Sequence, residues 1–89
     1  FMSQKIPFQE ETKDGYFIRT FTSEVNPEDL KWHIDEEDRI IEPIEKTDWL
    51  FQFDNQLPFS IDSKIEIKKG TWHRIIKGTG ELVLKIVKY

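Results

Sequence analysis

The chain of 89 residues contains two histidines, and each lies in a segment whose other residues could bind a metal or a ligand. His33 belongs to KWHIDEEDRII (residues 31–41), which also carries four acidic residues and one arginine. His73 belongs to KKGTWHRII (residues 68–76). Imidazole and carboxylate groups are common ligands of divalent cations, and a guanidinium group recognises carboxylates and phosphates. What these groups can do depends on whether the fold brings the two segments together.

Strand periodicity predicts that both histidines face one interior. Side chains alternate between the two faces of a β-strand. If the first segment is extended, His33, Asp35 and Arg39 share one face. In the second segment His73 shares its face with Ile75, and a histidine beside an isoleucine is expected to point inward. We therefore predict a pocket that holds both imidazoles, one carboxylate and one guanidinium.

The elements that must position these residues are short strands separated by turn residues. Asn26 and Pro27 predict a single helical turn in residues 26–32, since asparagine caps helices and proline suits a first helical position. Pro43 predicts that its strand is an edge strand or is bulged. Strands are expected at residues 15–22, 39–45, 49–53, 57–61, 64–67, 71–76 and 81–88, with turns at 54–56, 68–70 and 77–80.

Short strands at this spacing indicate an all-β sandwich or closed barrel. Trp49, Phe51 and Phe53 share one face of a single strand and would fill a small barrel. Leu82, Leu84 and Ile86 share one face of the last strand in the same way. A chain of this length is expected to form one domain, residues 1–89.

Composition excludes several classes of function. The net charge of −4 and the absence of a basic run argue against nucleic-acid binding, because phosphate contacts supply most of that affinity. No apolar run approaches the roughly 20 residues that span a bilayer, so we expect no membrane partner. The chain has no cysteine, which excludes thiolate chemistry and suits a cytoplasmic protein. Because so small a core is marginal in stability, a homodimer is expected.

The two histidine segments resemble the two motifs of the cupin superfamily. The segment DSKIEIKKGTWHR is similar to the second motif, G-x5-P-x-G-x2-H-x3-N, with Gly70 and His73 at the glycine and histidine positions. The segment WHIDEEDRIIEPIEK is similar to the first motif, G-x5-H-x-H-x3–4-E-x6-G, with His33 at the first histidine. The resemblance covers roughly residues 27–86 and implies a small double-stranded β-helix, the cupin jelly-roll barrel, with at most one short helical turn.

Cupins bind Fe, Mn, Ni or Zn through three histidines and a glutamate, and this chain departs from that ligand set. Asp35 stands at the second histidine and is an acceptable substitute, since a carboxylate binds such metals. Arg39 stands at the glutamate, where a guanidinium would repel a cation. Asp38 could replace the glutamate if the backbone bulges there. The resemblance therefore implies a divalent metal site of His33, Asp35, Asp38 and His73, if a metal is bound at all.

Three functions remain open. The first, which we favour from the sequence, is a binding protein whose pocket of His33, Asp35, Arg39 and His73 holds a small polar or anionic ligand without a required metal. The second is a metal-dependent enzyme of the dioxygenase, isomerase or epimerase type. The third is a structural or interaction protein with no pocket ligand. An Arg39 side chain that points into the pocket would disfavour a bound metal, and one that points outward would favour it again.

Overall fold

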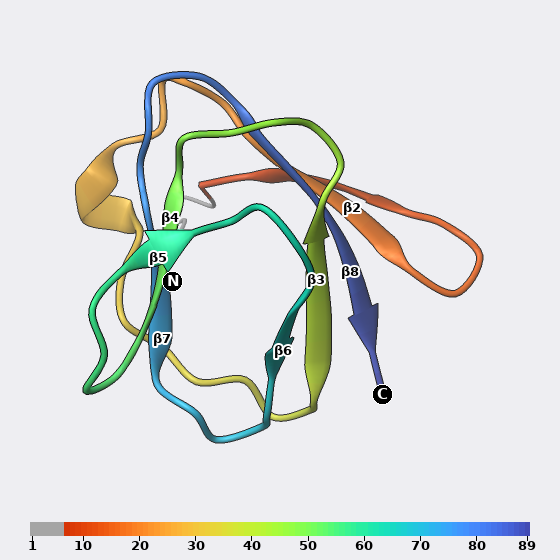
Figure 1. Ribbon diagram of the computed structural model, residues 1–89. Helices are drawn as coiled ribbons and strands as arrows, with labels where there is room; N and C mark the ends of the chain where they lie inside the picture. Colours follow the sequence, from red (N-terminus) through yellow and green to blue (C-terminus); the bar gives the residue numbers. More distant parts are fainter. Residues whose placement is uncertain (1–6) are drawn as a thin grey trace, which may run out of the picture.

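The computed structural model describes residues 7–89, so the first six residues of the predicted domain lie outside it. It contains eight strands and one 3-10 turn (Figure 1). The elements are β1 (Gln9–Thr12), β2 (Phe17–Phe21), η1 (Pro27–Asp29), β3 (Arg39–Pro43), β4 (Leu50–Phe53), β5 (Phe59–Ser60), β6 (Ile65–Ile67), β7 (His73–Ile76) and β8 (Leu82–Lys88). The prediction of an all-β chain with one helical turn is confirmed. No helix within residues 7–89 is long and apolar enough to cross a bilayer.

Two antiparallel sheets face each other and enclose the core. One sheet has five strands in the order β1-β2-β8-β3-β6, and the other has three in the order β5-β4-β7. Figure 1 shows β4, β5 and β7 on one side, opposite β3, β6 and β8, while the β1–β2 hairpin extends the larger sheet past β8. Most neighbours in the sheets, such as β3 and β8 or β4 and β7, are distant in sequence, so the sheets bring separate parts of the chain together.

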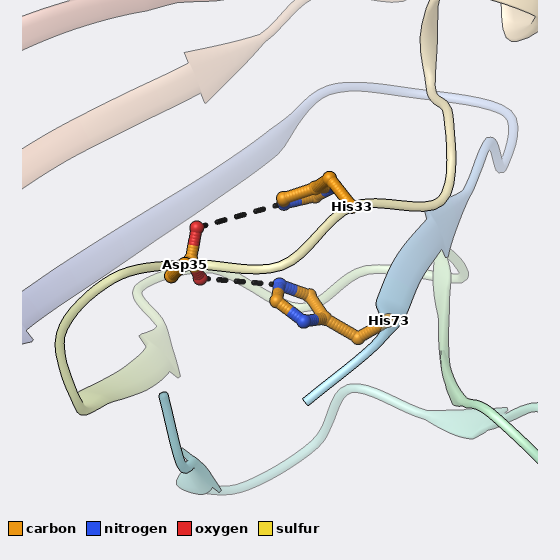
Figure 2. Close-up of side chains that lie close together, drawn as sticks. All are labelled: His33, Asp35 and His73. Carbon is orange, nitrogen blue, oxygen red and sulfur yellow. Dashed lines mark ion pairs between the residues drawn. The ribbon is translucent and has the colours of Figure 1, made fainter. Parts of the chain in front are cut away.

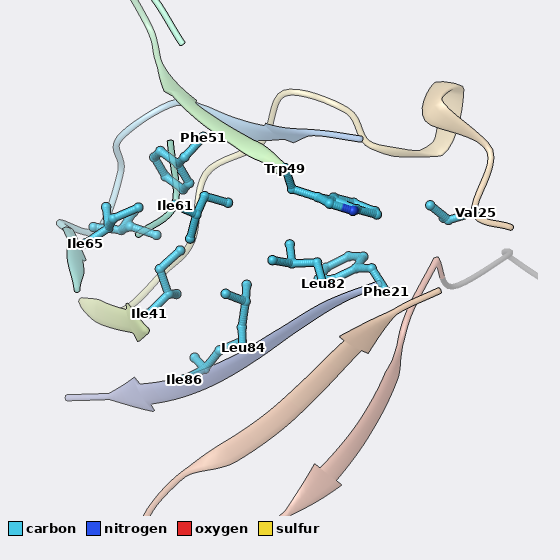
Figure 3. Close-up of a cluster of buried hydrophobic side chains, with 11 residues drawn as sticks. Phe21, Val25, Ile41, Trp49, Phe51, Ile61, Ile65, Leu82, Leu84 and Ile86 are labelled. Atoms are coloured by element: carbon cyan, nitrogen blue, oxygen red, sulfur yellow. The ribbon is translucent and has the colours of Figure 1, made fainter. Parts of the chain in front are cut away.

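The core forms where the inward faces of both sheets meet. Trp49, just before β4, and Phe51 within it are fully buried, and β8 alternates buried and partly buried residues as its sequence predicts. Figure 3 shows these side chains between the sheets. The buried hydrophobic residues are Phe21, Val25, Ile41, Trp49, Phe51, Ile61, Ile65, Ile67, Leu82, Leu84 and Ile86. Each such side chain contributes about 1.5–3 kcal/mol through burial.

Two local features differ from the sequence-based expectation. Strand β1 was not predicted, because its QEET sequence has no apolar alternation and all four residues are exposed. The prediction that Pro43 marks an edge or bulged strand is wrong, since β3 lies between β6 and β8 with a continuous register. The pairing of β3 with β6 ends at Ile41. Pro43 is still paired with β8 but lies beyond the end of the β3–β6 pairing, so its missing N–H breaks no hydrogen bond to β6.

The turn between β7 and β8 is clamped onto the start of β4. Asp48 accepts hydrogen bonds from the backbone N–H and the hydroxyl of Thr79, at 2.9 and 2.7 Å. The indole Nε1–H of Trp49 donates to the carbonyl of Gly80 at 2.9 Å. Gly78 lies so close that a Cβ there would be 2.7 Å from Trp49 Cδ1 and 2.8 Å from its backbone nitrogen. Only glycine fits at this approach.

We expect Gly78→Ala to destabilise the fold by about 1–3 kcal/mol, since the added methyl group must displace the Trp49 backbone. Urea denaturation, monitored by tryptophan fluorescence, measures the change in the free energy of unfolding. Gly80→Ala is the matched control, because a Cβ at Gly80 meets nothing within 4 Å, and its cost should stay within about 0.5 kcal/mol. Equal stabilities for the two variants would contradict the close approach at Gly78.

Candidate functional site

Backbone pairing brings the two histidine segments together. The N–H of each histidine donates to the carbonyl of the other, at 3.0 Å in both directions, which makes an isolated antiparallel bridge. The N–H of Gly70 donates to the carbonyl of Asp35 at 2.9 Å. Gly70 has a φ of 77°, a left-handed conformation that glycine adopts without strain and that turns the chain between β6 and β7. These bonds hold His33, Asp35 and His73 side by side (Figure 2).

The side chains alternate about this bridge as the strand pattern predicts. His73 and Asp35 are buried, at 4% and 8% exposure. His33 is more exposed, but its ring centroid lies 4.3 Å from that of His73. Trp32 and Trp72, the neighbours of the two histidines, are exposed on the outer surface. His73 therefore points into the interior, whereas His33 stands at the rim of the cavity with its side chain 51% exposed.

Both imidazole rings are oriented by the same local device. Nδ1 of His73 lies 2.8 Å from the carbonyl of Thr71, and Nδ1 of His33 lies 2.9 Å from the carbonyl of Lys31. A carbonyl can only accept, so each Nδ1 must carry the proton. In the neutral rings Nε2 then has a free lone pair, and both Nε2 atoms face Asp35. This is the usual arrangement of a metal-binding histidine.

The Asp35 carboxylate lies between the two Nε2 atoms. Its Oδ2 is 3.3 Å from Nε2 of His73, and its Oδ1 is 3.9 Å from Nε2 of His33. Oδ2 is buried, and no group within residues 7–89 donates a hydrogen bond to it. A carboxylate oxygen and an imidazole lone pair are both acceptors, so they repel unless a cation or a proton lies between them. One ligand atom from each of the three residues falls within 4.8 Å of the others.

The balance of burial and charge keeps Asp35 ionised. Burial by itself would raise the pKa of its carboxyl group. The contact with His73, the positive charge of Arg39 and the charges that His73 and His33 carry when protonated outweigh burial and hold the pKa below its ordinary value of 3.8. The carboxylate is therefore charged at neutral pH, which is the state that binds a metal.

Arg39 faces the pocket, as the shared strand face predicts, and it is held on two sides. Its Nε and Nη2 contact Oε2 of Glu37 at 2.8 and 2.7 Å, while its Nη1 lies 3.4 Å from Oδ1 of Asp35. Glu37 was not predicted as a partner of Arg39. Its spacing of two residues from Arg39 was the signal that it shares the same side of the chain.

Asp38 lies outside the group that His33, Asp35 and His73 form. Its Oδ1 accepts from the backbone N–H of Lys69 at 2.8 Å, and its carbonyl accepts from the N–H of Tyr89 at 3.0 Å. Both bonds tie the loop before β3 to other elements. The carboxylate that the sequence analysis offered as a fourth ligand thus has a structural partner.

The site borders a cavity of about 440 Å³. His33, Asp35, Arg39 and His73 all line it, and most of its wall is apolar. This is within the size range of small-molecule sites, roughly 300–1,000 Å³. The residues that line it are Pro7, Phe8, Arg19, Phe21, Asp29, Leu30, Lys31, His33, Asp35, Arg39, Ile41, Phe51, Ile67, His73, Ile75, Leu84 and Ile86. Arg19 was not predicted to lie there, although it alternates in phase with Phe17 and Phe21.

No family profile and no curated protein matches this sequence, but solved structures match its fold. A cupin-2 domain protein from Shewanella frigidimarina superposes with a TM-score of 0.61 at 17% identity, over 99% of this chain and 85% of that one. The iron(II) form of HppE with its substrate gives 0.65 at 13% identity, over 100% of this chain and 56% of HppE. One of the DMSP lyases RdDddP and RnDddQII gives 0.68 at 9% identity, over 82% of this chain and 36% of the lyase.

The chain therefore has the cupin fold, and the prediction drawn from its two motifs is confirmed. The likeness is one of backbone architecture, since sequence identity to each of these structures is below 20%. The chain spans little more than a third of the lyase and little more than half of HppE.

The lowered pKa of Asp35 predicts a pH dependence of stability. A carboxyl group whose pKa is lower in the folded than in the unfolded state contributes stability above the unfolded value, and that stability is lost as pH falls through the folded value. We expect the unfolding free energy of the wild type minus that of Asp35→Asn to be largest near neutrality and to shrink below about pH 4. Urea denaturation at several pH values from about 7 to 3 measures it. A difference that stays constant or grows on acidification would contradict this account.

Proposed function

We propose that this chain is a metal-dependent cupin-fold protein that binds one divalent ion, preferentially Fe²⁺, through Nε2 of His33, Nε2 of His73 and Oδ2 of Asp35. One observation carries the proposal. A buried carboxylate oxygen without a hydrogen-bond donor faces a ring nitrogen whose lone pair is fixed toward it at 3.3 Å. A divalent cation between the two atoms removes that repulsion.

The donor set fits such an ion. Two ligands at about 2.1 Å from a metal lie about 3.0–3.4 Å apart in octahedral or tetrahedral geometry. The 3.3 Å between His73 Nε2 and Asp35 Oδ2 already meets this requirement. His33 Nε2 lies 3.9 Å from the other oxygen, Oδ1, and the ligand atoms of the three residues fall within 4.8 Å of one another, so His33 must move closer to share an ion with Oδ2. Two histidines and one carboxylate with open positions are typical of non-haem Fe²⁺ sites. HppE, which shares the fold, has been solved with Fe²⁺ and with Co²⁺.

Residues around the three ligands prepare them for binding. The carbonyls of Lys31 and Thr71 fix both ring tautomers. Nη1 of Arg39 lies beside Oδ1 of Asp35, which leaves Oδ2 for the ion. Arg39 points inward, the orientation that disfavours a metal by its charge, but the carboxylate of Glu37 offsets that charge at 2.7 Å. A bound ion would supply a Lewis acid at the cavity wall, which His33, Asp35 and His73 all line.

A metal-free binding protein is the second candidate, and the position of Arg39 in the cavity wall favours it. A small polar or anionic ligand could accept from its guanidinium group. However, Glu37 engages two of its three nitrogens, and the third lies beside Asp35. A metal-free binding protein also gives no role to the buried Oδ2 of Asp35, which lacks a hydrogen-bond donor. The metal site therefore accounts for more of the observed geometry.

The predicted homodimer and cytoplasmic location remain part of this proposal. Trp32, Ile34 and Trp72 form an exposed apolar group on the outer surface, beside the bridge between the histidines. Apolar and aromatic side chains of this kind suit a subunit interface. Light scattering on the purified protein would give its mass in solution, and a monomer at all concentrations would contradict the dimer.

Metal titration of protein purified without a polyhistidine tag tests the proposed site. We expect one equivalent of Fe²⁺ to bind under anaerobic conditions. Since even partners of metal ligands contribute 10–100-fold to affinity, His73→Ala and Asp35→Ala should lower it by at least about 100-fold. Calorimetry and mass spectrometry of bound metal provide the measurements.

Asp38→Asn is the matched control, because asparagine can still accept from the Lys69 N–H and Asp38 lies outside the three-residue group. Its affinity should equal that of the wild type. A large loss in Asp38→Asn would show that the ligand set is wrong. Wild-type protein that takes up neither Fe²⁺, Mn²⁺, Zn²⁺ nor Ni²⁺ would overturn the metal site and leave the metal-free candidate.

A further inference from the structure

Arg19 lies in the cavity wall, and neither proposed function uses it. It occupies the middle of β2 between Phe17 and Phe21, and its side chain is only 15% exposed. In the register of the larger sheet it pairs with Leu84 of β8, whose side chain also lines the cavity. A guanidinium group at this position, among apolar side chains, is a candidate for ligand recognition.

The hydrogen bonds of Arg19 leave one end of its guanidinium group available. Its Nε and Nη2 both donate to Oε2 of Glu10 on β1, at 2.9 and 2.6 Å. Its carbon Cζ lies 3.9 Å from the centre of the Phe8 ring, which fixes the plane of the group. Within residues 7–89, Nη1 donates to no acceptor. Glu10 is absent from the cavity wall while Arg19 is part of it, so the free Nη1 is the end left for a ligand.

An apolar stretch of wall separates Arg19 from the His–Asp group. Arg19 pairs with Leu84 and Arg39 pairs with Lys88, four residues further along β8. At about 3.3 Å per residue, these two positions are about 13 Å apart along the strand. Leu84 and Ile86 line the cavity between them. A ligand that touches both ends therefore needs an apolar body.

The charge of the cavity wall favours an anion. Its charged side chains are three cations and two anions, namely Arg19, Lys31, Arg39, Asp29 and Asp35. A divalent ion at the proposed site would add two further positive charges. A monoanion suits the single free nitrogen of Arg19 better than a dianion, which would need more donors than that nitrogen offers.

We propose that the cavity binds an aliphatic monocarboxylate, with its carboxylate on Nη1 of Arg19, its alkyl chain along Leu84 and Ile86, and its other end toward the His33–Asp35–His73 group. The proposal rests on the metal site above for the second half of the ligand, while the Arg19 contact is independent of it. Because the ion adds positive charge, carboxylate binding and metal binding strengthen each other.

Four six-carbon probes with different head groups test the ligand class on Zn²⁺-loaded protein, which is diamagnetic and suits NMR titration. We expect saturable binding of hexanoate, at least tenfold weaker binding of 1-hexanol, and none of hexylamine, since a charge-assisted hydrogen bond changes affinity by about tenfold or more. Hexanoate should bind more weakly to the metal-free protein. Equal binding of hexanoate and hexylamine would overturn the proposal, and so would tighter binding of hexylphosphonate.

Substitutions locate the carboxylate. Arg19→Met should weaken hexanoate binding by about tenfold or more. The matched control is Arg74→Met, because Arg74 also bonds a neighbouring strand through Gln52 and stacks on an aromatic ring, Trp32, but on the outer surface. Glu10→Gln should strengthen binding, since it removes the negative charge behind Arg19. A purely structural role for Arg19 would not produce that gain, and unchanged binding in Arg19→Met would overturn the contact.

Failure of this inference can be told from failure of the metal site. Arg19→Met should take up Zn²⁺ as the wild type does, so protein that binds the ion but not hexanoate would overturn the ligand class alone. Wild-type protein that binds no ion, yet binds hexanoate in a manner that Arg19→Met abolishes, would overturn the metal site and support the Arg19 contact.

Discussion

The pocket depends on the pair of backbone hydrogen bonds between His33 and His73. These bonds join a loop that precedes β3 to the first residue of β7, and so they place two segments forty residues apart at one level of the barrel. Because residues at a bridge face the same side, the pairing sends both imidazole rings to the cavity side, with His73 buried and His33 at the rim. A one-residue shift would turn the rings outward and place a tryptophan in the cavity. Once the register is set, the carbonyls of Lys31 and Thr71 fix how each imidazole ring is turned.

Within that frame, electrostatics determines what the pocket can hold. Asp35 is buried without a donor for one of its oxygens, while Arg39 and Glu37 balance each other beside it. Removing a group from such a network costs more than the network contributes, because the remaining charge stays buried and unpaired. The pocket therefore tolerates an added cation at Oδ2 better than it tolerates the loss of any member.

The sequence predicted the strands and the facing of the histidines because both follow from alternation, which is a local property. The grouping of His33, Asp35, Arg39 and His73 could be predicted for the same reason. Strand β1 was out of reach, since its exposed polar residues carry no period. The pairing of Arg39 with Glu37 was missed because a run of acidic residues is also typical of a solvated loop. Arg19 was in phase with two inward phenylalanines, but the cavity beside it depends on how two sheets are spaced, which no single strand encodes.

The alternation about the bridge also gives the protein an optical reporter. Trp32 and Trp72 directly precede the two histidines and stand half-exposed, whereas Trp49 is enclosed in the core. An ion held by His33 and His73 would lie one residue from two indole rings and close enough to change their emission. The third indole responds chiefly to unfolding. Intrinsic fluorescence can thus follow occupancy of the pocket and integrity of the barrel in one sample, without an added dye.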